Sequence, residues 1–96
     1  MIEIRQTMEF VRWFEGLTDR QTRACVLARV RRLSLGNFGD TVPVGEGVLE
    51  LRIHHGPGYR VYLARMEARV VVLLAGGVKR TQDKDIRKAK ELAKGL

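Results

Sequence analysis

Hydrophobic residues in the first third of the chain recur at the spacing of an α-helix. Four of them fall at positions i, i+3, i+4 and i+7, namely Phe10, Trp13, Phe14 and Leu17. Because such positions share one helix face, they predict an amphipathic helix packed on a core, with Thr7 as its N-cap. Ahead of it, residues 2–5 alternate between isoleucine and charged side chains, which predicts a short strand.

A second helix is predicted directly after the first. Thr18 and Gln21 have the spacing of a capping box, in which each side chain accepts a hydrogen bond from the backbone N–H of the other residue. Apolar residues at helical spacing continue to about Leu35, where Gly36 ends the helix.

Beyond residue 47 the hydrophobic period changes from 3.6 to 2. Residues 36–47 hold four glycines and a proline and are predicted to form a loop. Residues 49–54 then alternate between apolar and polar side chains, which predicts a strand with one buried face. Residues 55–58 (HGPG) predict a hairpin turn, and residues 59–63 predict the return strand. The apolar run 70–74 predicts a central strand covered on both faces.

The C-terminal segment is predicted to begin with a loop at residues 76–80 and to continue as a helix capped by Thr81. The first turn of this helix carries acidic residues and the later turns carry lysines, the order that the helix dipole favours. The predicted element order is β-α-α-β-β-β-α. We therefore expect one α+β domain over residues 1–96, with helices packed on a twisted, largely antiparallel sheet.

Charge narrows the range of functions. The chain has 18 lysines and arginines against 11 acidic residues, for a net charge of +7. Residues 1–48 carry seven cations and six acids, whereas residues 49–96 carry eleven cations and five acids. A positive field on one half of a small domain favours a polyanion such as nucleic acid, or an acidic protein segment. A basic surface that only keeps the protein in solution remains the third alternative.

Several classes of protein do not fit the sequence. Cys25 is the only cysteine, so neither an intramolecular disulfide nor a cysteine-based metal site can form. Residues 1–5 lack the apolar segment of a signal peptide, and the apolar run 70–75 is too short for a membrane span. We expect a cytoplasmic protein with no membrane partner and no cofactor. Asp83 and Asp85 diverge on their helix and predict no metal site.

Strand alternation predicts a cationic patch on the hairpin. It places Arg52 and His54 on the polar face of one strand, and Arg60 and Tyr62 on the polar face of its partner. These side chains share one surface if the turn pairs the strands in register. Two cations that follow the next strand are expected to lean over the same region. They are Lys79 and Arg80.

A patch of this kind can both bind and cleave RNA. Cations hold phosphates, and Tyr62 can stack on a base. The ribose 2′-OH is a built-in nucleophile, so cleavage without a metal requires only that the protein orient it, neutralise the phosphoryl oxygens and protonate the leaving 5′-oxygen. Arginine suits the neutralising role because it donates two hydrogen bonds to one phosphate. The residues expected to bind RNA are Arg52, Arg60, Lys79, Arg80 and Lys84.

Each of these residues also has an ordinary structural interpretation. An arginine on a strand face is more often a solvated side chain than a catalytic group. Tyr62 can be a half-buried packing residue, and His54 and His55 can simply be exposed beside a glycine turn. Residue spacing alone leaves these alternatives open.

Four blocks of sequence carry a family resemblance. They are residues 36–40 (GNFGD), 43–53 (PVGEGVLELRI), 56–62 (GPGYRVY) and 74–82 (LAGGVKRTQ), the last followed by Asp85 and Ile86. In this order, and across nearly the whole chain, they resemble the HigB-like addiction module killer proteins of the RelE/ParE toxin superfamily. The resemblance implies a RelE-like fold with the element order given above. The same resemblance implies a type II toxin neutralised by a cognate antitoxin, often a helix-turn-helix protein. It also implies entry into the ribosome and metal-free cleavage of mRNA.

The resemblance also assigns roles to particular cations. By motif position, Arg52 and Arg60 match the strand cations, and Arg80, beside Lys79, matches the cation after the last strand. It implies that Arg60 and Arg80 stabilise the phosphate and the transition state, and that Arg52 helps to orient the 2′-OH.

Two departures from the RelE pattern leave proton transfer unassigned. RelE has a tyrosine in its C-terminal segment where this chain has Ile86, and a lysine where this chain has Glu50. The candidates for the acid and the base are His54, Tyr62 and Asp83.

Two other functions remain open at this point. One is a ParE-like protein that inhibits DNA gyrase and cleaves nothing, and the other is a protein without catalysis that only binds its antitoxin. Either would need a complementary protein surface rather than an organised phosphate site. The nuclease hypothesis therefore depends on whether the arginines lie together, because arginines on separate sides of the molecule would leave only a toxin-like fold.

Overall fold

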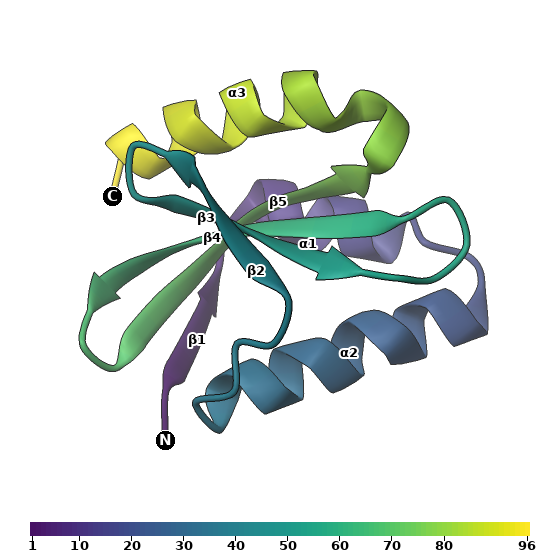
Figure 1. The fold of residues 1–96 in the computed structure, drawn as a ribbon, viewed down its shortest axis with the longest axis horizontal. Helices are drawn as coiled ribbons and strands as arrows, with labels where there is room; N and C mark the ends of the chain where they lie inside the picture. Colours follow the sequence, from purple (N-terminus) through teal and green to yellow (C-terminus); the bar gives the residue numbers. More distant parts are fainter.

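A five-stranded mixed sheet forms the centre of the computed structural model, which describes residues 1–96. The strand order is β1-β5-β4-β3-β2 (Figure 1). The strands are β1 (Glu3–Gln6), β2 (Thr41–Gly45), β3 (Val48–Ile53), β4 (Tyr59–Glu67) and β5 (Val70–Val78). Only β1 and β5 pair in parallel, and the other neighbours are antiparallel. The expected α+β fold with a largely antiparallel sheet is confirmed.

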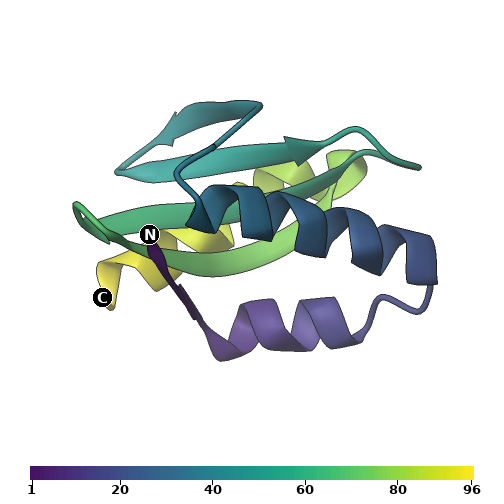
Figure 2. The same ribbon diagram turned by 90° about the horizontal axis from the view of Figure 1, so that it is seen from below.

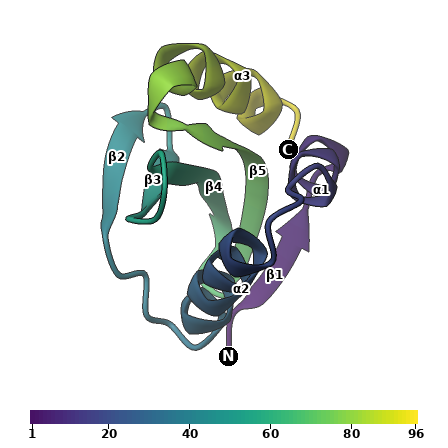
Figure 3. The same cartoon turned by 90° about the vertical axis from the view of Figure 1, so that its right-hand side faces the viewer.

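Helices cover both faces of this sheet. The helices are α1 (Met8–Glu15), α2 (Arg20–Ser34) and α3 (Gln82–Lys94), and a short 3-10 turn, η1 (Lys79–Thr81), precedes α3. Figure 3 shows α2 and α3 on opposite sides of the sheet, and Figure 2 shows α1 and α2 running beside each other. No helix combines the length and the apolar character that a membrane span requires.

The two faces of the sheet contain separate hydrophobic clusters. The first joins α1 and α2 to alternate strand residues, with Phe10, Val26 and Leu63 among its buried members. The second joins α3 to the other face, through Ala89 and Leu74 for example. Each buried residue of valine or leucine size contributes about 1.5–3 kcal/mol relative to an exposed one. Since both faces bury apolar surface, the sheet leaves little room for an open polar face.

One strand, β2, was not predicted from the sequence. Residues 36–47 were expected to form a loop, but β2 lies within them and pairs with β3. Pro43 lies in this strand, which is tolerated because β2 is an edge strand. Glu46 has φ 54°, and the glycines on either side of it also have positive φ, so they form the turn into β3. The turn residues indicated a loop and concealed the short strand between them.

The structure tests three predicted helix N-caps. Thr81 is the N-cap residue of α3, as predicted, but its side chain makes no capping hydrogen bond. Thr7 caps α1 as predicted, since its Oγ1 accepts a hydrogen bond from the backbone N–H of Phe10 at 3.1 Å. The capping box at Thr18 is wrong. The N-cap of α2 is Asp19, whose Oδ2 accepts hydrogen bonds from the backbone N–H (2.9 Å) and the hydroxyl (2.7 Å) of Thr22.

Strand β5 is longer than predicted because two glycines continue it. Gly76 and Gly77, expected in a loop, belong to β5. A Cβ atom on Gly76 would lie 2.2 Å from the Trp13 ring, and one on Gly77 would lie 1.8 Å from Oδ2 of Asp85. The glycines therefore allow α1 and α3 to approach the end of the strand closely.

We expect Gly76→Ala to destabilise the fold by about 1–3 kcal/mol, because the added methyl group must displace a packed indole ring. The measurement is the free energy of unfolding from urea denaturation. Gly95→Ala is the matched control: its nearest neighbour would be 3.6 Å away, so its effect should be about 0.5 kcal/mol or less. Equal stability of the two variants would contradict the close approach.

Candidate functional site

The register of the β3–β4 hairpin brings two predicted arginines together. Arg52 on β3 is directly opposite Arg60 on β4. The Arg52 side chain is 37% exposed, whereas the Arg60 side chain is only 11% exposed. The condition set by the sequence analysis, that the two strands pair in register, is therefore met.

Both arginines line a polar cavity of about 500 Å³ at the turn of the hairpin. It is lined by Arg52, His54, His55, Gly56, Pro57, Gly58, Arg60 and Lys79, and none of these is hydrophobic. We call it the hairpin pocket. The backbone N–H of Lys79 donates to the carbonyl of Gly58 at 2.8 Å, which holds η1 against the hairpin turn. The structure thus gathers Arg52, Arg60, Lys79 and His54 around one cavity.

Beneath the arginines lies a carboxylate that the sequence analysis did not select. Glu50 is wholly buried on β3. Its Oε1 accepts a hydrogen bond from Arg52 Nε at 3.1 Å, and its Oε2 accepts one from Gln82 Nε2 at 2.8 Å. Arg60 Nε lies 3.7 Å from the same Oε2. These contacts are charge-assisted, which makes them stronger than hydrogen bonds between neutral groups.

Tyr62 is the fourth group on this carboxylate, and its predicted exposure is wrong. It pairs with Glu50 across the hairpin, is fully buried, and donates its hydroxyl hydrogen to Glu50 Oε2 at 3.1 Å. Burial raises the pKa of Tyr62 well above its usual value, and the negative charge of Glu50 raises it further. Tyr62 therefore neither stacks on a base nor exchanges a proton with one.

The helix α3 explains both errors. Alternation assigned Glu50 and Tyr62 correctly to the face of Arg52 and Arg60, but that face was expected to be open. Instead, α3 begins over Glu50 through Gln82 and then covers the neighbouring apolar residues of the face. Only the part of the face nearest the hairpin turn stays open. The sequence did contain a signal for this burial, namely the apolar stripe of α3, because such a stripe must pack on one face of the sheet.

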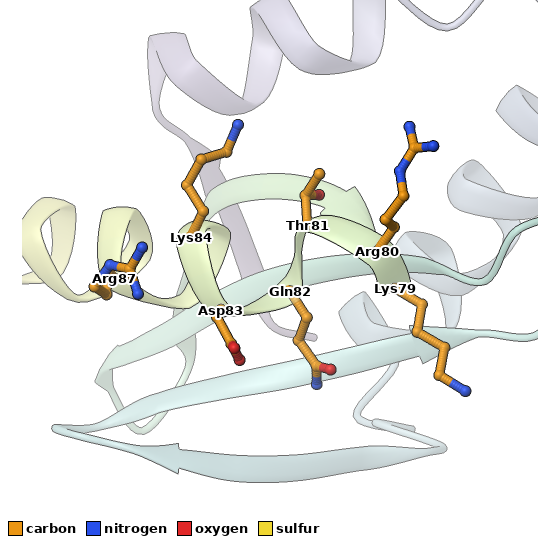
Figure 4. Close-up of a pocket in the computed structure, with 7 residues that line it drawn as sticks. All are labelled: Lys79, Arg80, Thr81, Gln82, Asp83, Lys84 and Arg87. Atoms are coloured by element: carbon orange, nitrogen blue, oxygen red, sulfur yellow. The ribbon is translucent and has the colours of Figure 1, made fainter.

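A second polar cavity, of about 440 Å³, lies beside the hairpin pocket at η1 and the start of α3. Its lining residues are Lys79, Arg80, Thr81, Gln82, Asp83, Lys84 and Arg87, and we call it the helix pocket (Figure 4). Lys79 borders both cavities. Figure 4 shows Arg80 and Lys84 pointing away from the side to which Lys79 and Gln82 point. Arg80 therefore does not join Arg52 and Arg60 in the hairpin pocket.

His54 is held at the rim of the hairpin pocket by Asp40. His54 Nε2 and Asp40 Oδ2 are 2.6 Å apart, and the His54 side chain is 76% exposed. The hydrogen bond from His54 lowers the pKa of Asp40, and nearby Arg52 and Arg29 lower it slightly more. The backbone N–H of Arg52 donates to the Asp40 carbonyl at 2.9 Å, and Arg29 donates to the Arg52 carbonyl.

The two carboxylates in the first turn of α3, of which only Asp83 lines the helix pocket, lie in different surroundings. Asp83 is exposed, whereas Asp85 is buried and accepts a hydrogen bond from the Thr81 hydroxyl at 2.5 Å. No group of three or more histidine, cysteine, aspartate or glutamate side chains gathers closely enough to hold a metal ion. What the two pockets offer to a ligand is therefore cationic and hydrogen-bonding groups.

We expect the pKa of Asp40, measured by carboxyl-carbon NMR titration, to lie below 3.8 and to rise toward that value in His54→Ala. A folded-state pKa below the unfolded one stabilises the fold at higher pH, and that stabilisation is lost as the pH falls through the folded pKa. The stability difference between the wild type and Asp40→Asn should thus begin to fall as the pH drops below about 4 and should vanish only below the folded-state pKa of Asp40. An Asp40 pKa that does not respond to His54→Ala would contradict the pairing.

Comparisons with known proteins identify the family. The family model described as phage derived protein Gp49-like (DUF891) matches residues 12–95. An uncharacterized protein of Haemophilus influenzae is 48% identical over 95 residues, which cover 99% of this chain and 96% of that protein. Both matches include the β3–β4 hairpin, η1 and α3. This chain therefore belongs to the Gp49-like family of phage-derived proteins, part of the RelE/toxin-like addiction module group.

Proposed function

We propose that this protein is a HigB-like toxin of a type II toxin–antitoxin system and that it cleaves mRNA on the ribosome without a metal ion. The observation that carries the proposal is the hairpin pocket, where Arg52, Arg60 and Lys79 face one polar cavity. A protein that acted only by binding another protein would not need three cations around a cavity without a single hydrophobic lining residue.

The proposed chemistry is transfer of the scissile phosphate to the neighbouring 2′-oxygen. The 2′-hydroxyl releases its proton to water, and its oxygen forms a bond to phosphorus as the bond to the 5′-oxygen breaks. The leaving 5′-oxygen takes up a proton, so the products are a 2′,3′-cyclic phosphate and a free 5′-hydroxyl. Negative charge grows on the phosphoryl oxygens in the transition state. Arg52 and Lys79 line the pocket and can neutralise this charge. Arg60, whose side chain is mostly buried, adds a further positive charge beside them.

His54 is our choice for proton transfer. It lines the hairpin pocket, and Asp40 orients its ring through the hydrogen bond to Nε2. In the protonated ring the other nitrogen, Nδ1, also carries a hydrogen, and it can give this proton to the leaving 5′-oxygen. The remaining candidates fit less well, because Tyr62 is buried and Asp83 lines the other pocket.

The helix pocket extends the proposed RNA-binding surface. Arg80 and Lys84 line it, and Lys79 joins it to the hairpin pocket. We assign Arg80 and Lys84 to a phosphate that flanks the scissile one, in place of the direct transition-state role that the sequence indicated for Arg80. The proposed partners are the mRNA, the ribosome and a cognate antitoxin, often a helix-turn-helix protein in such systems, and the proposed location is the cytoplasm.

We expect Arg52→Gln to slow mRNA cleavage by about 100-fold to 1,000-fold, the usual effect of losing one transition-state donor. Induced wild-type protein should arrest growth and produce new mRNA 5′ ends in register with codons, and the variant should do neither. Arg69→Gln removes the same charge at the β4–β5 turn and should remain toxic. Growth arrest that survives Arg52→Gln together with a DNA-damage response would point to gyrase and overturn the proposal.

We expect Lys79→Gln to flatten the salt dependence of binding to ribosomes that carry mRNA. Each phosphate neutralised on a single strand adds about −0.7 to the slope of log K against log salt, so the variant should lose about that amount. Lys94→Gln, at the far end of α3, is the charge-matched control and should retain the wild-type slope. Equal slopes for both variants would exclude Lys79 from phosphate contact.

A further inference from the structure

We propose that Glu50 is the positioning residue of the cleavage site, a buried carboxylate that orients both hairpin arginines and links them to the start of α3. The inference rests on the proposed function and assigns a role to a residue that does not itself reach the RNA. Glu50 is completely buried, so it acts only through the groups that contact it.

A hydrogen bond to Arg52 and an ion pair with Arg60 show which edge of each guanidinium faces the carboxylate. Arg52 presents Nε to Glu50 at 3.1 Å, and Arg60 presents Nε to it at 3.7 Å. A guanidinium has five N–H hydrogens, of which Nε carries one and the two Nη atoms carry four. The Nη atoms of Arg52 bond to no protein group, so they remain free for a phosphate. Glu50 thus fixes the direction in which the fork of Arg52 opens.

Arg60 is constrained from two sides. Its Nη1 donates to the carbonyl of Gly58 at 3.0 Å, and its Nε is buried without a hydrogen bond inside the protein. Glu50 Oε2 lies 3.7 Å from this Nε, within ion-pair distance but beyond the length of a hydrogen bond. Glu50 therefore restrains Arg60 through charge, and the carbonyl of Gly58 restrains it through a hydrogen bond.

Gln82 extends the same constraint to the second cationic segment. Its amide donates to Glu50 Oε2 at 2.8 Å, from the first residue of α3. η1, which carries Lys79 and Arg80, lies directly before this residue. Glu50 therefore holds β3, β4 and the η1–α3 junction in one arrangement, and this arrangement sets how the hairpin pocket and the helix pocket lie beside each other.

Because Glu50 is negatively charged, its removal should affect RNA binding and cleavage differently. A carboxylate behind two arginines repels a phosphate, so removing its charge should not weaken RNA binding. Its benefit lies in preorganisation, since oriented donors need not reorganise during the reaction. A positioning role therefore predicts slower cleavage together with equal or tighter binding, whereas general unfolding of the site would weaken both.

The test is Glu50→Gln, which keeps the size of the side chain and removes its charge. We expect kcat on programmed ribosomes to fall by about 10-fold to 100-fold. Binding of an mRNA with a 2′-deoxyribose at the mapped cleavage nucleotide should be unchanged or tighter. When Glu50→Gln is made in an Arg52→Gln background, it should cause little further fall in kcat. The reason is that the effects of substituting two residues that act as one unit do not add. Glu91→Gln, on the exposed side of α3, is the charge-matched control.

Three results would overturn the role of Glu50. The first is an unchanged kcat in Glu50→Gln, and the second is a double variant whose fall in kcat equals the product of the two single falls. The third is a pH–rate profile of Glu50→Gln that loses its acid limb, which would make Glu50 a proton acceptor instead. Wild-type protein that cleaves no RNA would overturn the proposed function as well. Failure of the Glu50 role and failure of the proposed function can be told apart by NMR of the Arg52 and Arg60 Nε–H groups. Faster hydrogen exchange of these groups in Glu50→Gln would show that Glu50 orders the arginines, and this measurement does not require activity.

Discussion

A carboxylate buried in the middle of a sheet must find hydrogen-bond donors, and this requirement organises the rest of the molecule. Glu50 has no contact with water, and an unpaired charge in that position would cost several kcal/mol. Its donors come from β3, β4 and the start of α3. The contacts that satisfy Glu50 therefore orient Arg52 and hold the last helix over the sheet, and the strand register places Arg60 directly opposite Arg52.

The position of the open pocket follows from how much of this face α3 covers. The helix starts over Glu50 and Tyr62 and packs on the apolar residues beyond them. The hairpin extends past the start of the helix, so its turn and its two arginines stay accessible. Gly76 and Gly77 allow the helices to lie close to β5. On this face of the hairpin, cationic groups thus border a cavity where the hydrophobic packing ends, and this edge is where a phosphate can approach.

Much of the architecture was predictable from local patterns. The helical stripe at residues 10–17, the alternation in β3 and the apolar run of β5 all correspond to observed elements. The pairing of Arg52 with Arg60 was also predictable, because a short turn between alternating strands determines the register. The errors arose where local composition was ambiguous. Turn-rich residues concealed β2, and the glycines of β5 resembled a loop although they serve a close packing contact.

The sequence by itself determined which residues share a strand face, because side-chain direction alternates along a strand whatever surrounds it. Only the tertiary structure decided whether that face meets water or a helix. Glu50, Arg52, Arg60 and Tyr62 all lie on one face, yet two of them are buried under α3 and two border a cavity. Tertiary packing also separated Arg80 from the hairpin arginines, because the direction of a side chain on η1 depends on how α3 docks on the sheet.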